Sequence, residues 1–260
     1  MRRFFVNSLP TEGVCCLDGR EAHHISAVLR LQAGEHVLLC AGDGSEAEAE
    51  LVSVEHTQVT ARILSRSAGK NETACRITLY QGIPKGDKLE QVCKCCTEIG
   101  VSAFVPVSCA RSVSKWEEQS ARRKCERLGI IAEQACKQCG GSVPPKVHMP
   151  LTTAQAAREA GGLRLFAYEN ERCISLAEAM KQAVKSGNAK EVSLFIGPEG
   201  GIDAQEAEML LRCGWQSVSL GRRILRTENA GFAAAVLILG IAGDLDAAQS
   251  ADDLHIAEEK

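Results

Sequence analysis

The chain has 260 residues, of which 45% are hydrophobic and 24% charged, and its formal net charge is −3. This composition is typical of a soluble globular protein with one large domain or two smaller ones. The sequence has no signal-peptide pattern and no apolar run long enough to cross a membrane, so we expect a cytoplasmic protein without membrane partners.

Charge is distributed unevenly along the chain. The segment from Asp244 to Lys260 carries a net charge of −5, so the other 243 residues carry +2. Basic clusters in that remainder lie at Arg2-Arg3, Lys85 with Lys88, Arg111 with Lys115, Arg122 to Lys124, and Arg222 to Arg226. Each is ordinarily a solvated face, but together they leave RNA binding open.

The thirteen cysteines indicate a reducing compartment, where thiols serve as small core residues. Two local groups, Cys93 to Cys96 and Cys136 with Cys139, have spacings that suggest a metal site. Both lie in or at the end of predicted helices, and neither has a histidine at ligand spacing. We therefore predict packing and no metal.

The first part of the chain predicts a small β-barrel of short strands. A strand over residues 37–40 leads through the turn Gly42-Asp43-Gly44 into a half-buried strand, where Ala47, Ala49 and Leu51 alternate with outward acids at 46, 48 and 50. A further strand covers 59–63. Residues 42–47 match the G-x-G-x-x-A dinucleotide fingerprint, but the period-2 pattern that follows favours a hairpin.

Two other features complete this region. Residues 21–30 form a short helical pattern whose paired histidines, His23 and His24, are more often structural than catalytic. The polar stretch 65–73 has the composition of a linker.

From Arg76 onward, strands alternate with helices, which is typical of a parallel sheet. The predicted strands cover 77–80, 103–107 and 163–168, and the predicted helices cover 87–99, 116–136 and 174–184. The most apolar stretch, 230–242, predicts a buried helix.

Two glycine-containing stretches follow strands near the end of this region. The strand over 192–196 precedes Gly197-Pro198-Glu199-Gly200-Gly201, after which Asp203 and Glu206 form a capping box. A second strand, closed by Val218 and Leu220, precedes Gly221 to Arg226, and Thr227 is a candidate cap of the next helix. Both loops should meet at one edge of the sheet, where ligands of open α/β sheets bind.

The loops differ in chemistry. Glycines 197, 200 and 201 let backbone groups approach a ligand, although a structural turn would explain them as well. The second loop places three arginines around Ile224 and Leu225, which suits a polyanion or a planar base; an arginine-rich surface turn is the alternative.

The stretches Ile196–Gly201 and Leu220–Ala230 together resemble the RsmE family of SPOUT-class methyltransferases, which modify N3 of a uridine in small-subunit (16S) ribosomal RNA. The segments 21–31, 84–87, 97–101 and 111–113 resemble it as well, in the expected order. The resemblance implies an α/β fold: a PUA-like β-barrel over 1–72 and a C-terminal domain with a trefoil knot over 73–260. It also implies bound S-adenosylmethionine, a homodimer through the C-terminal domain, and ribosomal RNA of the assembled small-subunit particle as partner.

The resemblance assigns roles to individual residues. Arg226 would orient the base or a phosphate at the methyl group, and Glu228 is the nearest candidate proton acceptor, unless it only favours the N-terminus of the last helix. The implied cofactor-binding residues are Ile196, Gly197, Glu199, Gly200, Leu220, Gly221, Ile224, Leu225 and Thr227. The implied RNA-binding residues, whose phosphate contacts predict salt-sensitive binding, are Arg2, Arg3, Arg30, Lys85, Arg111 and Arg223.

The chain departs from the family pattern at a few positions. Asn229 replaces a threonine and keeps the capacity to hydrogen-bond. Cys136 and Lys137 replace glycine and arginine, and the lysine keeps the charge without the bidentate fork.

Three other functions compete with this interpretation. One is a SPOUT enzyme with another RNA target, for example a ribose 2′-hydroxyl. Another is a non-catalytic RNA-binding or ribosome-assembly factor with the same fold. A nucleotide-dependent oxidoreductase is disfavoured, because its one fingerprint match predicts a hairpin.

Overall fold

The computed structural model describes residues 1–11 and 13–246, so most of the acidic C-terminal segment lies outside the described residues. The chain divides into two compact units. The first comprises Met1–Glu72, Cys93–Ser102 and Glu126–Lys146, and the second comprises Thr73–Val92, Ala103–Cys125 and the chain from Val147 onward.

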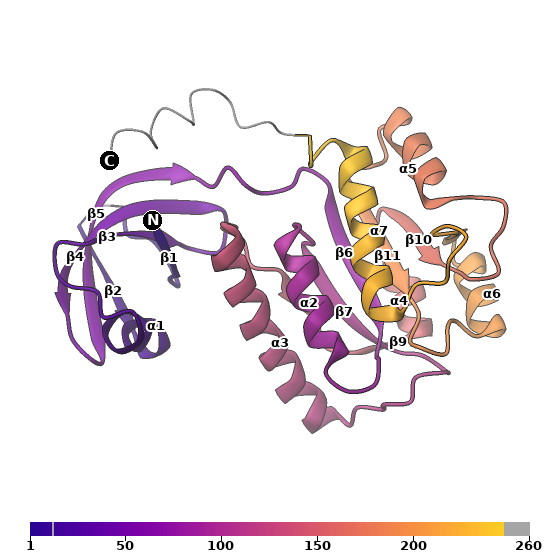
Figure 1. Ribbon diagram of the computed structural model, residues 1–260, viewed down its shortest axis with the longest axis horizontal. Coiled ribbons are helices and arrows are strands. Elements are labelled where there is room, and N and C mark those ends of the chain that lie inside the picture. Colours follow the sequence, from indigo (N-terminus) through magenta and orange to yellow (C-terminus); the bar gives the residue numbers. More distant parts are fainter. Residues whose placement is uncertain (12, 247–260) are drawn as a thin grey trace. The chain divides into compact units, whose positions relative to one another are not determined.

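The first unit contains a five-stranded mixed sheet in the order β1-β3-β4-β5-β2 (Figure 1). β1 pairs with β3 in parallel, and the other pairs are antiparallel. Its elements are β1 (Arg2–Phe5), β2 (Val14–Asp18), α1 (Gly19–His23), the π-helix η1 (His24–Val28), β3 (His36–Cys40), β4 (Ser45–Val54) and β5 (Gln58–Ala68). The predicted strands and the 42–44 hairpin are confirmed, but the pairing of the described strands leaves β1 and β2 as edges and does not close a barrel.

The core of this sheet consists of aliphatic and aromatic side chains that alternate along the strands. Phe4, Leu39 and Leu51 are fully buried together with Ile25 from η1. Burying such side chains is the main source of stability for a small unit like this one. His24 packs edge-on against Phe4, with 5.9 Å between ring centroids, so this histidine has a packing role.

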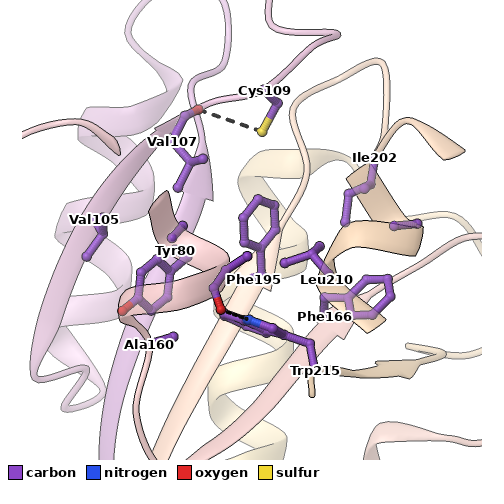
Figure 2. Close-up of a cluster of buried hydrophobic side chains, with 13 residues drawn as sticks. Tyr80, Val105, Val107, Cys109, Ala160, Phe166, Phe195, Ile202, Leu210 and Trp215 are labelled. Atoms are coloured by element: carbon purple, nitrogen blue, oxygen red, sulfur yellow. Dashed lines mark hydrogen bonds between the residues drawn. The ribbon is translucent and has the colours of Figure 1, made fainter. Parts of the chain in front are cut away.

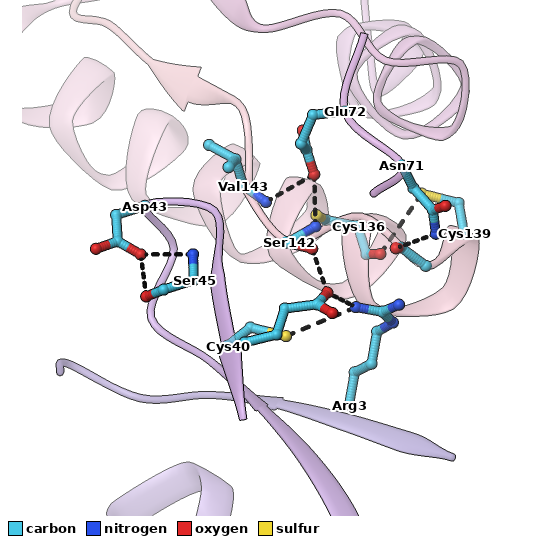
Figure 3. A network of polar contacts seen from close by, with 12 residues as sticks. Arg3, Cys40, Asp43, Ser45, Asn71, Glu72, Cys136, Cys139, Ser142 and Val143 are labelled. Atoms are coloured by element: carbon cyan, nitrogen blue, oxygen red, sulfur yellow. Dashed lines mark hydrogen bonds and ion pairs between the residues drawn. The ribbon is translucent and has the colours of Figure 1, made fainter. Parts of the chain in front are cut away.

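The prediction that all three acids of β4 point outward is wrong for Glu46. Its side chain is buried, and its carboxylate pairs with the Arg3 guanidinium and accepts a hydrogen bond from the Ser142 hydroxyl (Arg3 and Ser142 are labelled in Figure 3). A buried carboxylate requires partners of this kind. The cationic partner comes from a strand far away in the sequence, so the local alternation could not reveal it.

The predicted linker at 65–73 is also wrong in its first half, since β5 continues to Ala68 and pairs with β4 from Ser45 to Glu48. The second half is fixed by polar contacts. The Glu72 carboxylate accepts the backbone N–H of Ser142 at 2.6 Å, and the Asn71 amide donates to the Gly140 carbonyl at 2.9 Å (Figure 3).

The second unit contains a sheet in the order β12-β10-β11-β6-β7-β8, with β9 pairing β7. The neighbours from β12 to β7 pair in parallel, as predicted. The strands are β6 (Arg76–Gly82), β7 (Ala103–Ser108), β8 (Lys146–Val147), β9 (Leu151–Thr152), β10 (Leu163–Ala167), β11 (Glu191–Ile196) and β12 (Gln216–Val218). Helices α4 (Thr153–Glu159), α5 (Leu176–Lys185), α6 (Ala204–Arg212) and α7 (Thr227–Ala242) belong to this unit, whereas α2 (Lys88–Glu98) and α3 (Glu118–Cys139) are divided between the two units at Cys93 and Glu126.

An aromatic cluster packs on this parallel sheet (Figure 2). The Trp215 ring meets Tyr80 and Phe195 edge-on, with centroid distances of 5.6 and 5.9 Å, and its indole N–H donates to the Ala157 carbonyl at 3.1 Å. The polar atom of the largest core side chain is thereby satisfied. The cluster packs β6 and β11 against the segment that leads into β12. The loops described below follow β10, β11 and β12.

Helix α7 lies alongside β6 and β11 (Figure 1). The prediction of a buried helix is right for one face only, because Phe232 and Leu237 are 37% and 39% exposed. Just beyond the helix, the Asp244 carboxylate accepts the backbone N–H groups of Ala74 and Cys75 at 2.7 and 2.9 Å. Among the described residues, no helix combines the length and apolarity that a membrane crossing requires.

Candidate functional site

Three loops of the second unit surround a cavity of about 600 Å³. They follow β10, β11 and β12, which are neighbours in the sheet and run parallel, so their carboxyl ends meet at one edge. The lining residues fall in the ranges 167–172, 196–202 and 219–230, with Lys88 added from α2. The predicted meeting of two glycine-containing loops is thus confirmed.

The first loop, residues 197–202, is tightly packed. The Gly201 N–H donates to the Pro198 carbonyl at 2.9 Å, and Gly201 has a φ of +70°, which only glycine adopts without strain. A Cβ on Gly197 would lie 2.9 Å from the Ile202 side chain. The predicted capping box is confirmed, since Asp203 and Glu206 exchange hydrogen bonds at the start of α6.

Arg111 holds this loop from outside the cavity lining. Its guanidinium donates to the Gly200 carbonyl at 3.0 Å and pairs with Asp203 at 3.3 Å. Lys85 contributes through its backbone, because its N–H donates to Glu199 at 3.1 Å. Both residues were predicted to bind RNA, and that role stays a prediction.

Lys88 lies between two carboxylates at the wall of the cavity. Its Nζ is 2.8 Å from Glu199 and 3.5 Å from Glu228. The hydrogen bond to Glu199 raises the pKa of Lys88. Partial burial pushes the pKa of Glu199 upward, but hydrogen bonds from Lys88 and backbone N–H groups outweigh it, so the pKa lies below its ordinary value.

The prediction that Thr227 caps α7 is wrong. Arg226 occupies the cap position without a side-chain cap, and Thr227 is the first helical residue. The buried Thr227 hydroxyl accepts from the Gln81 amide at 2.9 Å and donates to the Gly197 carbonyl at 2.6 Å. It therefore joins β6 and the first loop to α7, and these long-range partners take the hydroxyl away from the cap.

The second loop is open in comparison. β12 ends at Val218, so Leu220 belongs to the loop and not to the strand as predicted. Ile224 is 86% exposed. Within the part of the chain that the structure describes, the exposed side chains of Arg222, Arg223 and Arg226 make no hydrogen bond or ion pair.

The third loop, after β10, was missed by sequence reasoning. Tyr168, Glu169 and Arg172 from this loop line the cavity. The signal was available, because the strand over 163–168 was predicted to lie in the same parallel sheet. No glycine pattern marks the end of this strand, however, so the sequence does not single out the three residues.

The predicted site residues mostly fall together. The cavity is lined by all the residues predicted to bind the cofactor, by both predicted catalytic residues and by one predicted RNA contact: Ile196, Gly197, Glu199, Gly200, Leu220, Gly221, Ile224, Leu225, Thr227, Arg226, Glu228 and Arg223. Arg2, Arg3 and Arg30 belong to the other unit, and Arg3 is already paired with Glu46. Their contacts with RNA stay predictions.

No group of three or more histidines, cysteines or acids in the described residues could hold a metal ion. All thirteen thiols are free, and burial raises the pKa values of Cys109 and Cys136 to about 12. Lys137, which departs from the family pattern, pairs with Glu21 at 2.6 Å and with Glu133 at 3.0 Å. The lysine thus has a structural role within the first unit.

The cavity has the composition of a nucleoside-type cofactor site. Three glycines of the first loop line it without side chains, and a Cβ at Gly197 or Gly201 would collide with the surrounding atoms. Apolar side chains of Ile196, Leu220 and Leu225 supply surfaces for a planar base. These residues therefore fit S-adenosylmethionine.

Comparisons with known proteins agree with this geometry. Residues 71–239 match the RNA methyltransferase domain family, and residues 17–64 match the RNA methyltransferase PUA domain family. The fold and the three-loop cavity are thus those of an RNA methyltransferase with a PUA domain. The chain belongs to the ribosomal RNA small subunit methyltransferase E family, which confirms the resemblance in the sequence.

Three relatives illustrate the similarity. The ribosomal RNA small subunit methyltransferase E of Bacillus subtilis is 33% identical over 88% of this chain and 93% of its own. The enzyme of the same name from Neisseria gonorrhoeae, solved bound to S-adenosyl methionine, is 28% identical over 93% of this chain and 98% of its own, with a TM-score of 0.83. A Legionella pneumophila methyltransferase, solved in complex with the cofactor SAM, is 29% identical over 92% and 96%, with a TM-score of 0.83.

Proposed function

We propose that this protein transfers the methyl group of S-adenosylmethionine to N3 of a specific uridine in small-subunit (16S) ribosomal RNA. The observation that carries the proposal is the convergence of every predicted cofactor residue on one cavity, in a chain whose relatives are solved with that cofactor. When bound, the cofactor supplies an electrophilic methyl group. The cytoplasm, where small ribosomal subunits are assembled, is the proposed location.

Different residues of the cavity have different roles in this reaction. Backbone groups of the two glycine-containing loops hold the cofactor, and much of the catalytic effect comes from positioning. Arg226, at the start of α7, orients the base or a neighbouring phosphate. The target base must leave any stacked or paired position to reach the site.

The proton on N3 of the uracil must also leave. Glu228 is the proposed acceptor, because its carboxylate lines the cavity in the first turn of α7. The alternative is that Glu228 only stabilises the helix N-terminus. A Glu228→Gln variant separates the two: loss of methyl transfer with unchanged thermal stability supports the acceptor, and loss of stability alone supports the helix role.

The unpaired arginines of the second loop support RNA binding beside the cavity. Arg222, Arg223 and Arg226 are exposed and unpaired among the described residues, so their charges are available to phosphates. Arg2, Arg3, Arg30, Lys85 and Arg111 are proposed as further phosphate contacts. The assembled small-subunit particle is the proposed substrate, and affinity should fall steeply with salt.

The domain boundary at 72/73, the trefoil knot and the homodimer through the C-terminal domain belong to the same proposal. A knotted chain is a rare exception among folds. The exposed apolar side chains of Phe232 and Leu237 on α7 support a dimer, since they otherwise face solvent. Sedimentation of the wild type and of Phe232→Glu tests it: a dimer that becomes a monomer supports the proposal, and a wild-type monomer contradicts it.

Two experiments test the activity. Calorimetry with S-adenosylhomocysteine should show binding that Gly197→Trp abolishes; no binding by the wild type would favour a non-catalytic RNA-binding factor. Nucleoside mapping of ribosomal RNA from cells lacking the protein should show a missing N3-methyluridine. A missing 2′-O-methyl nucleoside would instead support a ribose-directed enzyme, and an unchanged profile would contradict both.

A further inference from the structure

The third loop places a carboxylate directly against the first glycine-containing loop. If Gly201 carried a Cβ, that atom would lie 2.4 Å from Glu169 Oε1 and 3.0 Å from its Oε2. Both carboxylate oxygens therefore occupy the space that the missing side chain of Gly201 leaves free. Glu169 and Gly201 both line the cavity.

Three acids line this cavity, and they differ in their partners. Glu199 is bonded to Lys88, and Glu228 lies within ion-pair distance of the same lysine. For Glu169, the described residues provide no hydrogen bond or ion pair. Its carboxylate is half-buried at the wall of the cavity, where its acceptor capacity is free for a ligand.

The topology places this carboxylate in the middle of the cavity wall. In the sheet, β10 lies between β11 and β12, so the loop after β10 emerges between the two glycine-containing loops. The middle of a ligand that spans both glycine-containing loops therefore lies beside the third loop. In S-adenosylmethionine, the central part between the base and the amino-acid chain is the ribose.

We infer that Glu169 accepts hydrogen bonds from the vicinal hydroxyls of the cofactor's ribose, an inference that rests on the proposed function. A carboxylate offers two acceptor oxygens and no donor, which matches two neighbouring hydroxyl donors. Acidic side chains recognise ribose hydroxyls in the same way in other nucleotide-binding folds. Glu169 is then a residue that selects a ribonucleoside, and Gly201 is the residue that makes room for it.

Calorimetry on the full chain tests this role. Glu169→Ala should weaken S-adenosylhomocysteine about ten- to hundredfold, as expected for lost hydrogen bonds to a charged acceptor. The wild type should lose a similar factor when the probe is its 2′-deoxy or 3′-deoxy form, whereas Glu169→Ala should bind all three forms within about threefold of one another. Glu178→Ala, which removes an exposed acid on α5 away from the cavity, should behave like the wild type.

The outcomes separate the alternatives. If Glu169→Ala still discriminates against the deoxy probes as the wild type does, the inference is overturned. If it weakens S-adenosylhomocysteine but not 5′-methylthioadenosine, which keeps the ribose and lacks the amino acid, the carboxylate binds the ammonium group and the inference is likewise overturned. If the wild type binds none of the probes, the proposed function itself fails.

A second variant displaces the same carboxylate by enlarging the neighbouring residue. Gly201→Ala should displace Glu169, since the new Cβ would overlap the carboxylate, and should abolish discrimination between the ribose and deoxyribose probes. Gly187→Ala controls for backbone strain, because it has a φ of +75° and no atom within 4 Å of the added Cβ. Retained discrimination in Gly201→Ala would contradict the inference.

Discussion

The two glycine-containing loops emerge from neighbouring parts of one sheet, yet they are built in opposite ways. The loop at 197–202 is fixed by Thr227, by Arg111 and by the capping box of α6. The loop at 219–226 leaves Ile224 exposed and its arginines unpaired among the described residues. We infer that the first loop mainly provides a fixed shape for the cofactor, and that the second adds positive charge for the RNA to its own cofactor contacts. Variants that change shape should therefore differ in effect from variants that remove charge.

The largest effect is expected where shape is changed. Gly197→Val should weaken the affinity for the cofactor more than about a hundredfold, because even a Cβ would lie 2.9 Å from the Ile202 side chain. Calorimetry with S-adenosylhomocysteine measures the loss. Gly129→Ala, on α3 with no atom within 4 Å of the added Cβ, is the matched control. Unchanged affinity in Gly197→Val would refute the fixed-shape interpretation.

A charge variant in the second loop should affect turnover alone. Arg226→Ala should lower kcat/KM for ribosomal RNA by roughly a hundredfold, as for the loss of a positioned charged donor. The affinity for S-adenosylhomocysteine and the Tm should stay unchanged, since the guanidinium has no partner among the described residues. Arg212→Ala, an exposed arginine on α6, serves as the control. If cofactor affinity falls in parallel with turnover, the two loops do not divide their roles.

The threonine that joins the first loop to α7 should matter for stability. Thr227→Val leaves the buried Gln81 amide and the Gly197 carbonyl without this partner, at a cost of about 1–3 kcal/mol of unfolding free energy. Denaturant unfolding measures the loss, and Thr227→Ser, which keeps the hydroxyl, should recover most of it. A Thr227→Val protein as stable as the wild type would show that the first loop is held by other contacts.

The smallest effect is expected from the Glu199 carboxylate. Its pKa lies below the ordinary value in the folded state, so its stabilising contribution is present above about pH 4.5 and is lost as the pH falls through the folded pKa. The wild type should therefore have a slightly higher Tm than Glu199→Gln at pH 7, and the difference should vanish in acid. A difference that grows on acidification would contradict the Lys88 pairing.

The sequence predicts this molecule well where the signals are local. The capping box of Asp203 and Glu206, the 42–44 hairpin and the parallel strands all follow from spacing within a few residues. The meeting of the two loops follows from the parallel topology, which the alternation of strands and helices indicates.

The predictions fail where the partner is distant in the chain. Thr227 looks like a cap until Gln81, 146 residues away, is placed beside it, and Glu46 looks exposed until Arg3 is paired with it. Glu169 has no motif of its own, because a single acid after a strand forms no pattern, and only the predicted strand before it indicates this edge of the sheet. Its position becomes informative only when the fold brings it against Gly201.

The Asp244 contacts with Ala74 and Cys75 have a consequence for engineering. The point where the chain enters the parallel sheet and the point where it leaves α7 are within hydrogen-bond distance. A chain shortened after α7 must therefore keep Asp244, because this one carboxylate satisfies both backbone N–H groups at the entry to the sheet.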